Sequence, residues 1–496
     1  MSIFYVSPGG SSLNPGTINS PWTLAHAAAG ASGVLQGGDT VLLLSGVYNI
    51  PPASPQTFTL SGASNAPILF CPAPNAVPIL NGGITISGSN ITLYNIRSTW
   101  THDGIRTTNT PGSSPADVPR AATGVSLVLG SNVRLIECMV YDQAGGIFSA
   151  KGAANFQIID SIVFNNGWIG PDRGHGHGFY SQNDGTTRHL MRGNILFDNY
   201  STGIKLGGTS GTELLRFDVW DNCSFNNQLA AYSQHGLDSA FHYQGAGLDK
   251  GDTTILRNFF ANPHDLTSVA FEVGDGVAGA FPVTVNDNLV YGRTLINMWP
   301  SLEMRRNILT DFPALADINI PVGLLRIDNN TPSYVIDQNI YATRQTDSPF
   351  GRALIMGATG RTFAQWQSLT TWDDNTTFID GPLPAPVIRV VPSMYTFGKG
   401  HVYVMNPLGA AQVSVNLNSI VPLRGSYAIY HVYDYVTGGP PTVRGIANGN
   451  LVALPMTSKT PPTPFGGNPL PTQNNTFGAF VVTPDPLRPY TLNLGI

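Results

Sequence analysis

One short pattern is repeated between residues 124 and 207, and it restricts the folds open to this chain. A glycine followed by alternating apolar and polar residues occurs four times, as Gly124-Val-Ser-Leu, Gly146-Ile-Phe-Ser, Gly178-Phe-Tyr-Ser and Gly203-Ile-Lys-Leu. Each unit is too short to form a helix and cannot bury its own apolar residues. Copies stacked on one another can bury them, so the repeat predicts a solenoid.

A second motif recurs over a longer part of the chain and supports the same fold. A small polar residue, usually Asn, stands before apolar residues in nine segments, at Asn95, Cys138, Ser161, Asn194, Asn222, Asn258, Asn288, Asn307 and Asn339. The shorter gaps approach one turn of a three-sided β-solenoid, and the longer gaps add an inserted loop. Strands stack about 4.8 Å apart in such a fold, so equivalent Asn side chains form columns that can hydrogen-bond along the axis.

The alternative fold is an antiparallel β-sandwich, whose hairpins should show two-residue turns such as Asn-Gly. These turns are scarce here, so we predict an all-β chain with a right-handed parallel β-helix over residues 1–380. The stretch Pro382-Leu-Pro-Ala-Pro386 is typical of a linker. Alternating segments from Val387 to Val482 then predict a C-terminal antiparallel β-sandwich over residues 387–496.

Composition and charge exclude several functions. Only 11% of the 496 residues are charged and the net charge is −5, which gives no case for binding nucleic acid. No apolar run is long enough to cross a bilayer. The N-terminus enters a strand pattern at once and shows no signal peptide. We therefore expect an extracellular or virion-surface protein whose signal has been removed, or which leaves its cell by another route such as lysis.

The opening of the chain resembles a known group of proteins. The segments Tyr5-Val-Ser-Pro-Gly-Gly-Ser, Ser20-Pro-Trp-Thr-Leu, Gly38-Asp-Thr-Val and Gly46-Val-Tyr are similar to the start of bacterial and phage parallel β-helix proteins of the pectate-lyase-like superfamily. The resemblance implies a capping helix over the first turn of the solenoid, which we place at Trp22–Ala29. It implies little about function, because the superfamily includes lyases, hydrolases, epimerases, adhesins and phage spikes.

Three long excursions interrupt the repeat, at residues 99–123, 165–177 and 228–250. We expect them to leave one corner of the solenoid and to stand along the same side. If the repeated glycines are in register, Val125, Ile147, Phe179 and Ile204 point into the core. Ser126, Phe148, Tyr180 and Lys205 then form an outward column.

This arrangement predicts a cleft with aromatic surfaces suited to sugar rings. We expect Phe148, Tyr180, Trp168 and His175 to bind substrate, and the excursions to contribute the further rings Trp100, His177, Tyr232, His235, His242 and Tyr243. The alternative is that Phe148 and Tyr180 are covered by the loops as a satellite core. An exposed apolar patch is informative only once exposure is shown.

Catalytic residues are proposed from the cluster Asp172-Arg-Gly-His-Gly-His177 and from Lys205. His177 or Lys205 could act as a base, and Arg173 could neutralise a uronate carboxylate, which together describe a polysaccharide lyase. The alternative is that the histidines are turn residues and Lys205 is a solvated charge. A polygalacturonase-type hydrolase is not inferred, because the chain lacks the paired carboxylates that hydrolysis requires. Asp142 and Asp198 share a column with Asn165 and Asn226 and are better explained as a structural ladder.

Two functions remain open from the sequence. The first is an extracellular polysaccharide-binding protein, with lyase activity on an acidic polysaccharide as its enzymatic form. The second is a non-catalytic spike, receptor-binding or decoration protein of a phage or phage-like particle, attached through the C-terminal domain. No metal ligand set and no cofactor is identified, and calcium is left open. A homotrimer around the solenoid axis is the oligomer to test first.

Overall fold

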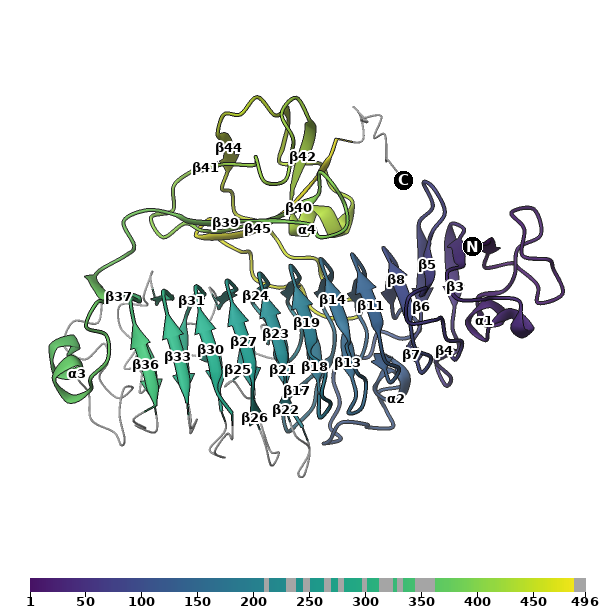
Figure 1. Cartoon of the computed structure of the whole chain (residues 1–496), viewed down its shortest axis with the longest axis horizontal. Helices are drawn as coiled ribbons and strands as arrows, with labels where there is room; N and C mark the ends of the chain where they lie inside the picture. Colours follow the sequence, from purple (N-terminus) through teal and green to yellow (C-terminus); the bar gives the residue numbers. More distant parts are fainter. Residues whose placement is uncertain are drawn as a thin grey trace.

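The computed structural model describes residues 1–208, 214–228, 238–243, 250–262, 269–274, 281–296, 301–311, 324–327, 333–343 and 362–485. Within these ranges three long parallel sheets run side by side along the molecule, and each successive turn of the chain adds one strand to each sheet (Figure 1). We name the sheets after their first strands: the β1, β3 and β4 sheets. The predicted parallel β-helix is confirmed.

The β1 sheet contains, in spatial order, β1 (Ile3–Val6), β2 (Thr40–Leu43), β5 (Ile68–Pro72), β8 (Ile91–Tyr94), β11 (Val133–Ile136), β14 (Gln157–Ile159), β19 (His189–Arg192), β23 (Phe217–Trp220), β27 (Thr253–Leu256), β30 (Val283–Asn286), β33 (Leu302–Arg305) and β36 (Tyr334–Asp337). The β3 sheet contains β3 (Gly46–Asn49), β6 (Pro78–Asn81), β9 (Arg97–Thr99), β12 (Met139–Tyr141), β15 (Ile162–Phe164), β20 (Ile195–Phe197), β24 (Cys223–Phe225), β28 (Phe259–Ala261), β31 (Leu289–Tyr291), β34 (Ile308–Thr310), β37 (Ile340–Thr343) and β38 (Thr377–Asp380). The β4 sheet contains β4 (Gln56–Phe58), β7 (Ile84–Ile86), β10 (Ser126–Val128), β13 (Ile147–Ser149), β18 (Phe179–Ser181), β21 (Ile204–Leu206), β25 (Asp238–Tyr243), β29 (Val269–Val273), β32 (Arg293–Ile296) and β35 (Leu325–Ile327). Two small pairs stand outside these sheets: β16 (Trp168–Ile169) with β17 (Gly174–His175), and β22 (Leu214–Leu215) with β26 (Lys250–Gly251).

A sharp turn between the β1 and β3 sheets explains the repeated polar residue. Its first residue adopts a left-handed conformation, as in Asp221 and Arg257, with φ of 56° and 57°. The next residue is the buried Asn of the predicted column. Asn222 Nδ2 donates to Asn258 Oδ1 at 2.9 Å, and Asn258 Nδ2 donates to Asn288 Oδ1 at 2.9 Å. The column therefore satisfies the polar groups of successive turns inside the solenoid.

Both ends of the solenoid are covered. At the N-terminal end, α1 (Leu24–Ala28) buries Leu24, Ala27 and Ala28 in the main core, which confirms the predicted capping helix. At the C-terminal end, α3 (Phe363–Leu369) places Trp366 in the same core, where its indole Nε1 donates to Asp373 Oδ2 at 2.8 Å. The stacked strands consequently do not expose their apolar interior at the two ends.

The C-terminal region forms two antiparallel sheets. The larger contains, in spatial order, β39 (Val387–Pro392), β40 (Gly400–Met405), β45 (Phe477–Pro484), β42 (Ser426–His431) and β43 (Val443–Ile446). The smaller contains β41 (Gln412–Val415) and β44 (Val452–Pro455), and α4 (Val432–Thr437) follows β42. A separate apolar core lies between the sheets, including Val402, Val413 and Phe480. Among the described residues no helix is long and apolar enough to cross a membrane.

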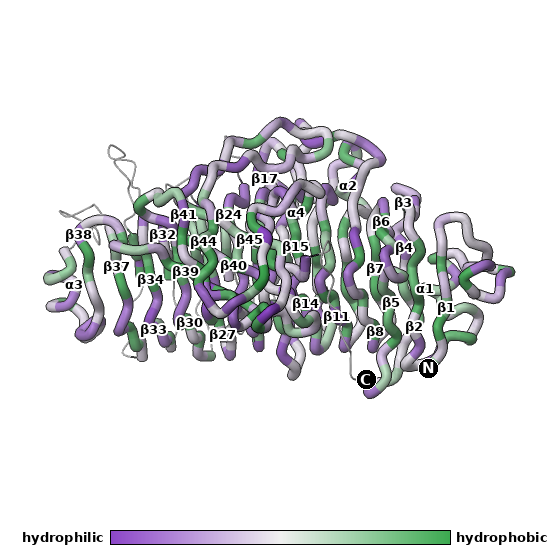
Figure 2. Tube along the Cα trace, turned by 90° about the horizontal axis from the view of Figure 1, so that it is seen from above, coloured by the Kyte–Doolittle hydropathy of each residue, from purple (hydrophilic) through white to green (hydrophobic). Residues whose placement is uncertain are grey.

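The C-terminal region packs on the outer face of the β3 sheet, over the middle of the solenoid (Figures 1 and 2). Aromatic rings stack along this face, with centroids 4.9 Å apart for Phe164 and Phe197 and 5.5 Å apart for Phe197 and Phe225. Tyr433 of α4 packs against both Phe197 and Phe225. This apolar contact makes the two parts one packed unit.

Buried polar contacts fix the same interface. Lys399 Nζ lies 2.6 Å from Glu137 Oε2, and the backbone N–H of Met394 donates to Asp160 Oδ2 at 3.0 Å. The segment between β44 and β45 reaches further, to the first excursion of the solenoid. There the Arg106 guanidinium donates to the Phe465 carbonyl at 2.9 Å.

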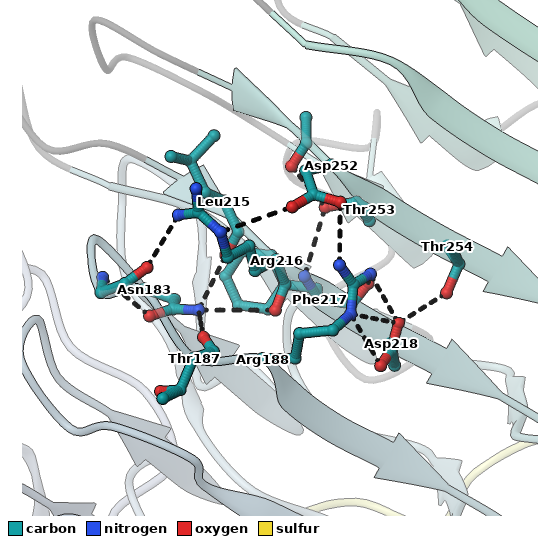
Figure 3. A network of polar contacts seen from close by, with 12 residues as sticks. Asn183, Thr187, Arg188, Leu215, Arg216, Phe217, Asp218, Asp252, Thr253 and Thr254 are labelled. Atoms are coloured by element: carbon teal, nitrogen blue, oxygen red, sulfur yellow. Dashed lines mark hydrogen bonds and ion pairs between the residues drawn. The ribbon is translucent and has the colours of Figure 1, made fainter.

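Ion pairs join successive turns on the β1 sheet (Figure 3). Arg188 lies before β19 and contacts Asp218 of β23 at 2.6 Å and Asp252, before β27, at 2.8 Å. Thr254 donates a further hydrogen bond to Asp218 at 2.7 Å. One arginine thus connects three consecutive turns at this corner.

Candidate functional site

A cavity of about 870 Å³ lies on the outer face of the β4 sheet, over β13, β18 and β21. The first two excursions form its walls, since Ser113 and Ala121 come from residues 99–123 and the β16–β17 hairpin from residues 165–177. All seven residues predicted to bind or act on substrate line it: Phe148, Trp168, Arg173, His175, His177, Tyr180 and Lys205. Their placement together does not establish their roles, which stay predictions.

The outward column runs through β13, β18 and β21 as expected, but it begins one residue later than predicted. Phe148 pairs with Tyr180, and Tyr180 pairs with Lys205, in parallel register. On β10 the member of this column is Leu127, whereas Ser126 is buried and pairs with Ile147. The prediction for Ser126 was therefore wrong, and so was the core position of Val125, which lines the cavity.

The shift has a local cause in the first excursion. The chain returns to the solenoid through α2 (Arg120–Thr123), a helix capped by Gly124. Gly124 belongs to this cap, and Val125 is the residue that leads from the cap to the sheet. The Gly124 pattern therefore resembles the other three in sequence but not in register.

Two stacked ring pairs give the cavity its aromatic character. The rings of Phe148 and Tyr180 are 4.9 Å apart at 20°, and both side chains are only partly buried. The His177 ring lies 5.5 Å from the Tyr180 ring. The partial exposure leaves surface on Phe148 and Tyr180 for contact with a ligand.

The second pair, Trp168 and His175, belongs to the β16–β17 hairpin. Their rings are 4.8 Å apart and almost parallel at 2°. Trp168 is only 4% exposed and packs in a small core with Val118 and Ala144. This pair therefore stabilises the cavity wall and leaves little ring surface exposed for contact with a ligand.

Asp172 connects the polar residues of the wall. Its carboxylate contacts Arg173 Nη1 at 2.8 Å and His175 Nε2 at 3.1 Å. Arg173 Nη2 also donates to Ser113 Oγ at 2.8 Å, which ties the two excursions together. Burial lowers the pKa of His175, the charge of Arg173 acts in the same direction, and the hydrogen bond to Asp172 opposes the shift. The His175 imidazole is therefore neutral near pH 7.

The column continues beyond Lys205 with an ionisable pair. His242 pairs in register with Lys205, and Glu272 follows on β29. His242 Nε2 lies 3.7 Å from Glu272 Oε2, and both residues are buried. Sequence reasoning missed Glu272, although a glutamate between Phe271 and Val273 in an apolar strand is a usable signal.

The remaining ring predictions have mixed outcomes. Trp100 and Tyr243 are fully buried and Tyr243 belongs to the main core, so neither offers a surface to a ligand. The prediction was wrong for these two because loop aromatics can pack inward as well as outward. Tyr232 and His235 lie outside the described residues.

No group of three or more His, Cys, Asp or Glu side chains is placed to hold a metal ion, as far as the structure describes the chain.

Comparison with known proteins agrees with this architecture. Residues 75–219 match a family described as a right handed beta helix region. Together with the three parallel sheets, this match defines the fold as a right-handed parallel β-helix, as predicted. No curated protein matches the chain significantly in sequence.

The solved structures that match this chain include two lyases and a protein in complex with xylose. Pectate lyase Pel9A is 16% identical, with coverage of 62% of this chain and 75% of that chain and a TM-score of 0.43. A rhamnogalacturonan lyase is 15% identical, with coverage of 76% and 87% and a TM-score of 0.42. XylC in complex with xylose is 10% identical, with coverage of 97% and 100% and a TM-score of 0.46. At such low identity these are likenesses of fold, which do not transfer an activity to this chain.

Proposed function

We propose that the cavity binds a sugar unit of a polysaccharide and that acidic sugars are its preferred ligands. The observation that carries this proposal is the partly exposed stack of Phe148 on Tyr180 inside the cavity. Aromatic faces pack against the apolar C–H face of a sugar ring, while hydroxyl groups at its edge bond to polar neighbours. The volume of about 870 Å³ accommodates a ligand of several sugar units.

The preference for acidic sugars rests on the cations beside the stack. Lys205 follows Tyr180 in the same column, one strand spacing of about 4.8 Å further along the axis. Arg173 lies on the cavity wall, and its side chain is 52% exposed. A carboxylate on a bound sugar would thus meet positive charge at two edges of the aromatic surface.

The same residues support lyase chemistry as the enzymatic form of the proposal. His177, or Lys205 in its uncharged form, would accept the proton on the carbon next to the sugar carboxylate. The electron pair left behind would form a double bond to the neighbouring ring carbon as the bond from that carbon to the glycosidic oxygen breaks, and the departing oxygen would take up a proton from an acidic group or from water. Arg173 would stabilise the charge that develops on the carboxylate in this step.

One contact favours binding without cleavage. Arg173 already has Asp172 as a partner at 2.8 Å, so its charge is partly neutralised before any substrate arrives. A non-catalytic receptor-binding or decoration protein of a phage or phage-like particle would need the aromatic stack to bind a sugar, but it would not need an arginine whose charge is available to a substrate. The recognition protein and the lyase would both bind the polysaccharide, but only the lyase would release a cleavage product.

Binding is tested by calorimetry against a panel of acidic and neutral oligosaccharides. We expect Tyr180→Ala to weaken binding at least about tenfold, and Tyr180→Phe to retain it, because stacking needs only the ring. Tyr395→Ala is the matched control, since Tyr395 is an exposed tyrosine on the C-terminal region. Equal affinities for Tyr180→Ala and Tyr395→Ala would refute the proposed binding site.

Cleavage is tested on any oligosaccharide that binds. A lyase releases unsaturated products whose ultraviolet absorbance rises with time. The base is then the residue whose substitution, Lys205→Met or His177→Gln, stops product formation. Lys205→Met should also weaken binding of acidic oligosaccharides, because it removes a positive charge beside the stack. Binding by the unaltered protein without any product would reject the lyase and leave the recognition function.

A further inference from the structure

Four residues hold equivalent positions just after consecutive strands of the β3 sheet. They are Asp142, Asn165, Asp198 and Asn226, which follow β12, β15, β20 and β24. All four adopt the left-handed conformation, with φ between 51° and 59°. Because the backbone conformation is the same and the strands are in register, their side chains leave the solenoid in the same direction. The column lies at the seam with the C-terminal region, where Tyr433 and the segment before β45 cover it.

The first member of the column has a complete set of partners. Asp142 Oδ1 accepts hydrogen bonds from the Arg106 guanidinium and from the backbone N–H of Phe465, the latter at 2.8 Å. A buried carboxylate needs such compensation, because removal of a charge from water is costly.

Asp198 is equally buried and has no such compensation. Its exposed fraction is 0%, and neither carboxylate oxygen has a hydrogen-bond partner among the described residues. No ion pair found in the described part of the chain includes it. Burial consequently raises the pKa of this carboxyl well above its usual range.

The residues on either side of Asp198 in the column each leave a side-chain oxygen, not a donor, without a partner in the part of the chain that the structure describes. Asn165 Nδ2 donates to the Pro462 carbonyl at 3.0 Å, and Asn226 Nδ2 donates to Gln473 Oε1 at 2.6 Å. A backbone carbonyl can only accept, so the orientation of the Asn165 amide is fixed. Oδ1 of both asparagines is buried and has no partner among the described residues.

We propose that Asp198, together with the amide oxygen of Asn165 or of Asn226, binds a metal cation that prefers oxygen ligands, such as Na⁺, K⁺ or Ca²⁺. Stacked side chains are about 4.8 Å apart, so an ion midway between two of their oxygens lies about 2.4 Å from each, which suits Na⁺ and Ca²⁺. The larger K⁺ would reach its longer distance by lying to one side of the line that joins the two oxygens. The bound ion would supply the positive charge that Arg106 supplies to Asp142. It would also stabilise the seam between the solenoid and the C-terminal region.

The test measures thermal unfolding at pH 8 in tetramethylammonium chloride, with NaCl, KCl or CaCl₂ replacing it at constant ionic strength. We expect at least one of the three metal ions to raise the Tm by about 2 °C or more. Asp198→Asn should abolish this response, because the neutral amide no longer attracts a cation. Asp311→Asn is the matched control: Asp311 is a buried carboxyl that follows β34, several turns away, where Thr343 donates to its Oδ2 at 2.8 Å, and its loss should leave the response intact.

A second measurement does not depend on folding of the variant. Crystals of the unaltered protein grown with RbCl or with CaCl₂ should show an anomalous scattering peak between Asp198 and a neighbouring asparagine oxygen. The proposal would be overturned if none of the three metal ions raised the Tm, or if they raised the Tm of Asp198→Asn as much as that of the unaltered protein. If KCl or CaCl₂ raises the Tm, absence of the anomalous peak with the corresponding salt, where Rb⁺ stands in for K⁺, would do the same, and would leave a protonated, uncharged Asp198 as the explanation.

Discussion

Asn258 is the residue whose loss should reveal how much the internal Asn column contributes to stability. Its side-chain oxygen accepts from Asn222 Nδ2 and from the Asn222 backbone N–H, both at 2.9 Å. Its amide nitrogen donates to the Val219 carbonyl at 2.8 Å and to Asn288 Oδ1 at 2.9 Å. Asn258→Ala would therefore leave two N–H groups of Asn222 without this acceptor, while Asn288 Oδ1 would keep the hydrogen bond from the backbone N–H of residue 258.

The expected cost follows from the two donors. A buried donor left without a partner costs about 1–3 kcal/mol, so Asn258→Ala should lower the free energy of unfolding by about 2–6 kcal/mol. Asn258 is not among the residues with positive φ, so alanine introduces no backbone strain. Asn450→Ala, at an exposed position, is the control and should change stability by less than about 0.5 kcal/mol.

Urea unfolding followed by circular dichroism measures this difference, and amide hydrogen exchange locates it. The backbone N–H of Asn222 should exchange faster in Asn258→Ala, because its acceptor has been removed. A loss of stability no larger than that of Asn450→Ala, with unchanged exchange at Asn222, would refute the view that the column is energetically important.

Three further predictions concern charged groups. Burial raises the pKa of Asp160 from 3.8 to about 6, so ionisation of this carboxyl weakens the folded state progressively as pH rises from about 4 to 6. Asp160→Asn should therefore stabilise the protein by up to about 3 kcal/mol at pH 8 and have little effect at pH 3, as measured by urea unfolding at both values. Arg188→Met should lower stability by about 1 kcal/mol in low salt and by less in high salt, because Arg188 is partly exposed and its charge is screened. Lys399→Met should cost about 3–5 kcal/mol and speed proteolysis between the solenoid and the C-terminal region, because Glu137 would remain buried without its partner.

Periodic features of the solenoid could be predicted from the sequence, whereas packing between distant segments could not. The Asn column is predictable because one polar residue recurs at each turn and has no other way to be satisfied. The register of β10 was missed because α2 inserts a helix cap before the strand, which the Gly124 pattern does not reveal. The burial of Trp100 and Tyr243 depends on how the excursions fold back, which no local pattern encodes.

One signal of the domain interface was present but unused. Strands such as Ile195-Leu-Phe197 and Phe259-Phe-Ala261 are apolar at every position. A strand with one face in water alternates apolar and polar residues, while a strand covered on both faces does not. These runs could have predicted that a second layer covers the β3 sheet. The cavity was predictable in its residues because Phe148, Tyr180 and Lys205 follow a strict repeat.

The docking of the C-terminal region has a consequence for how the chain matures. The face that carries Phe164, Phe197 and Phe225 belongs to middle turns of the solenoid, but the residues that cover it, such as Tyr433 and Phe477, are translated much later. During synthesis the stacked rings of Phe164, Phe197 and Phe225 are therefore exposed to water until the C-terminal region has been made and packs on them. Chains that stop before Val387 would keep this row permanently bare, and self-association through it should be the main fate of such fragments.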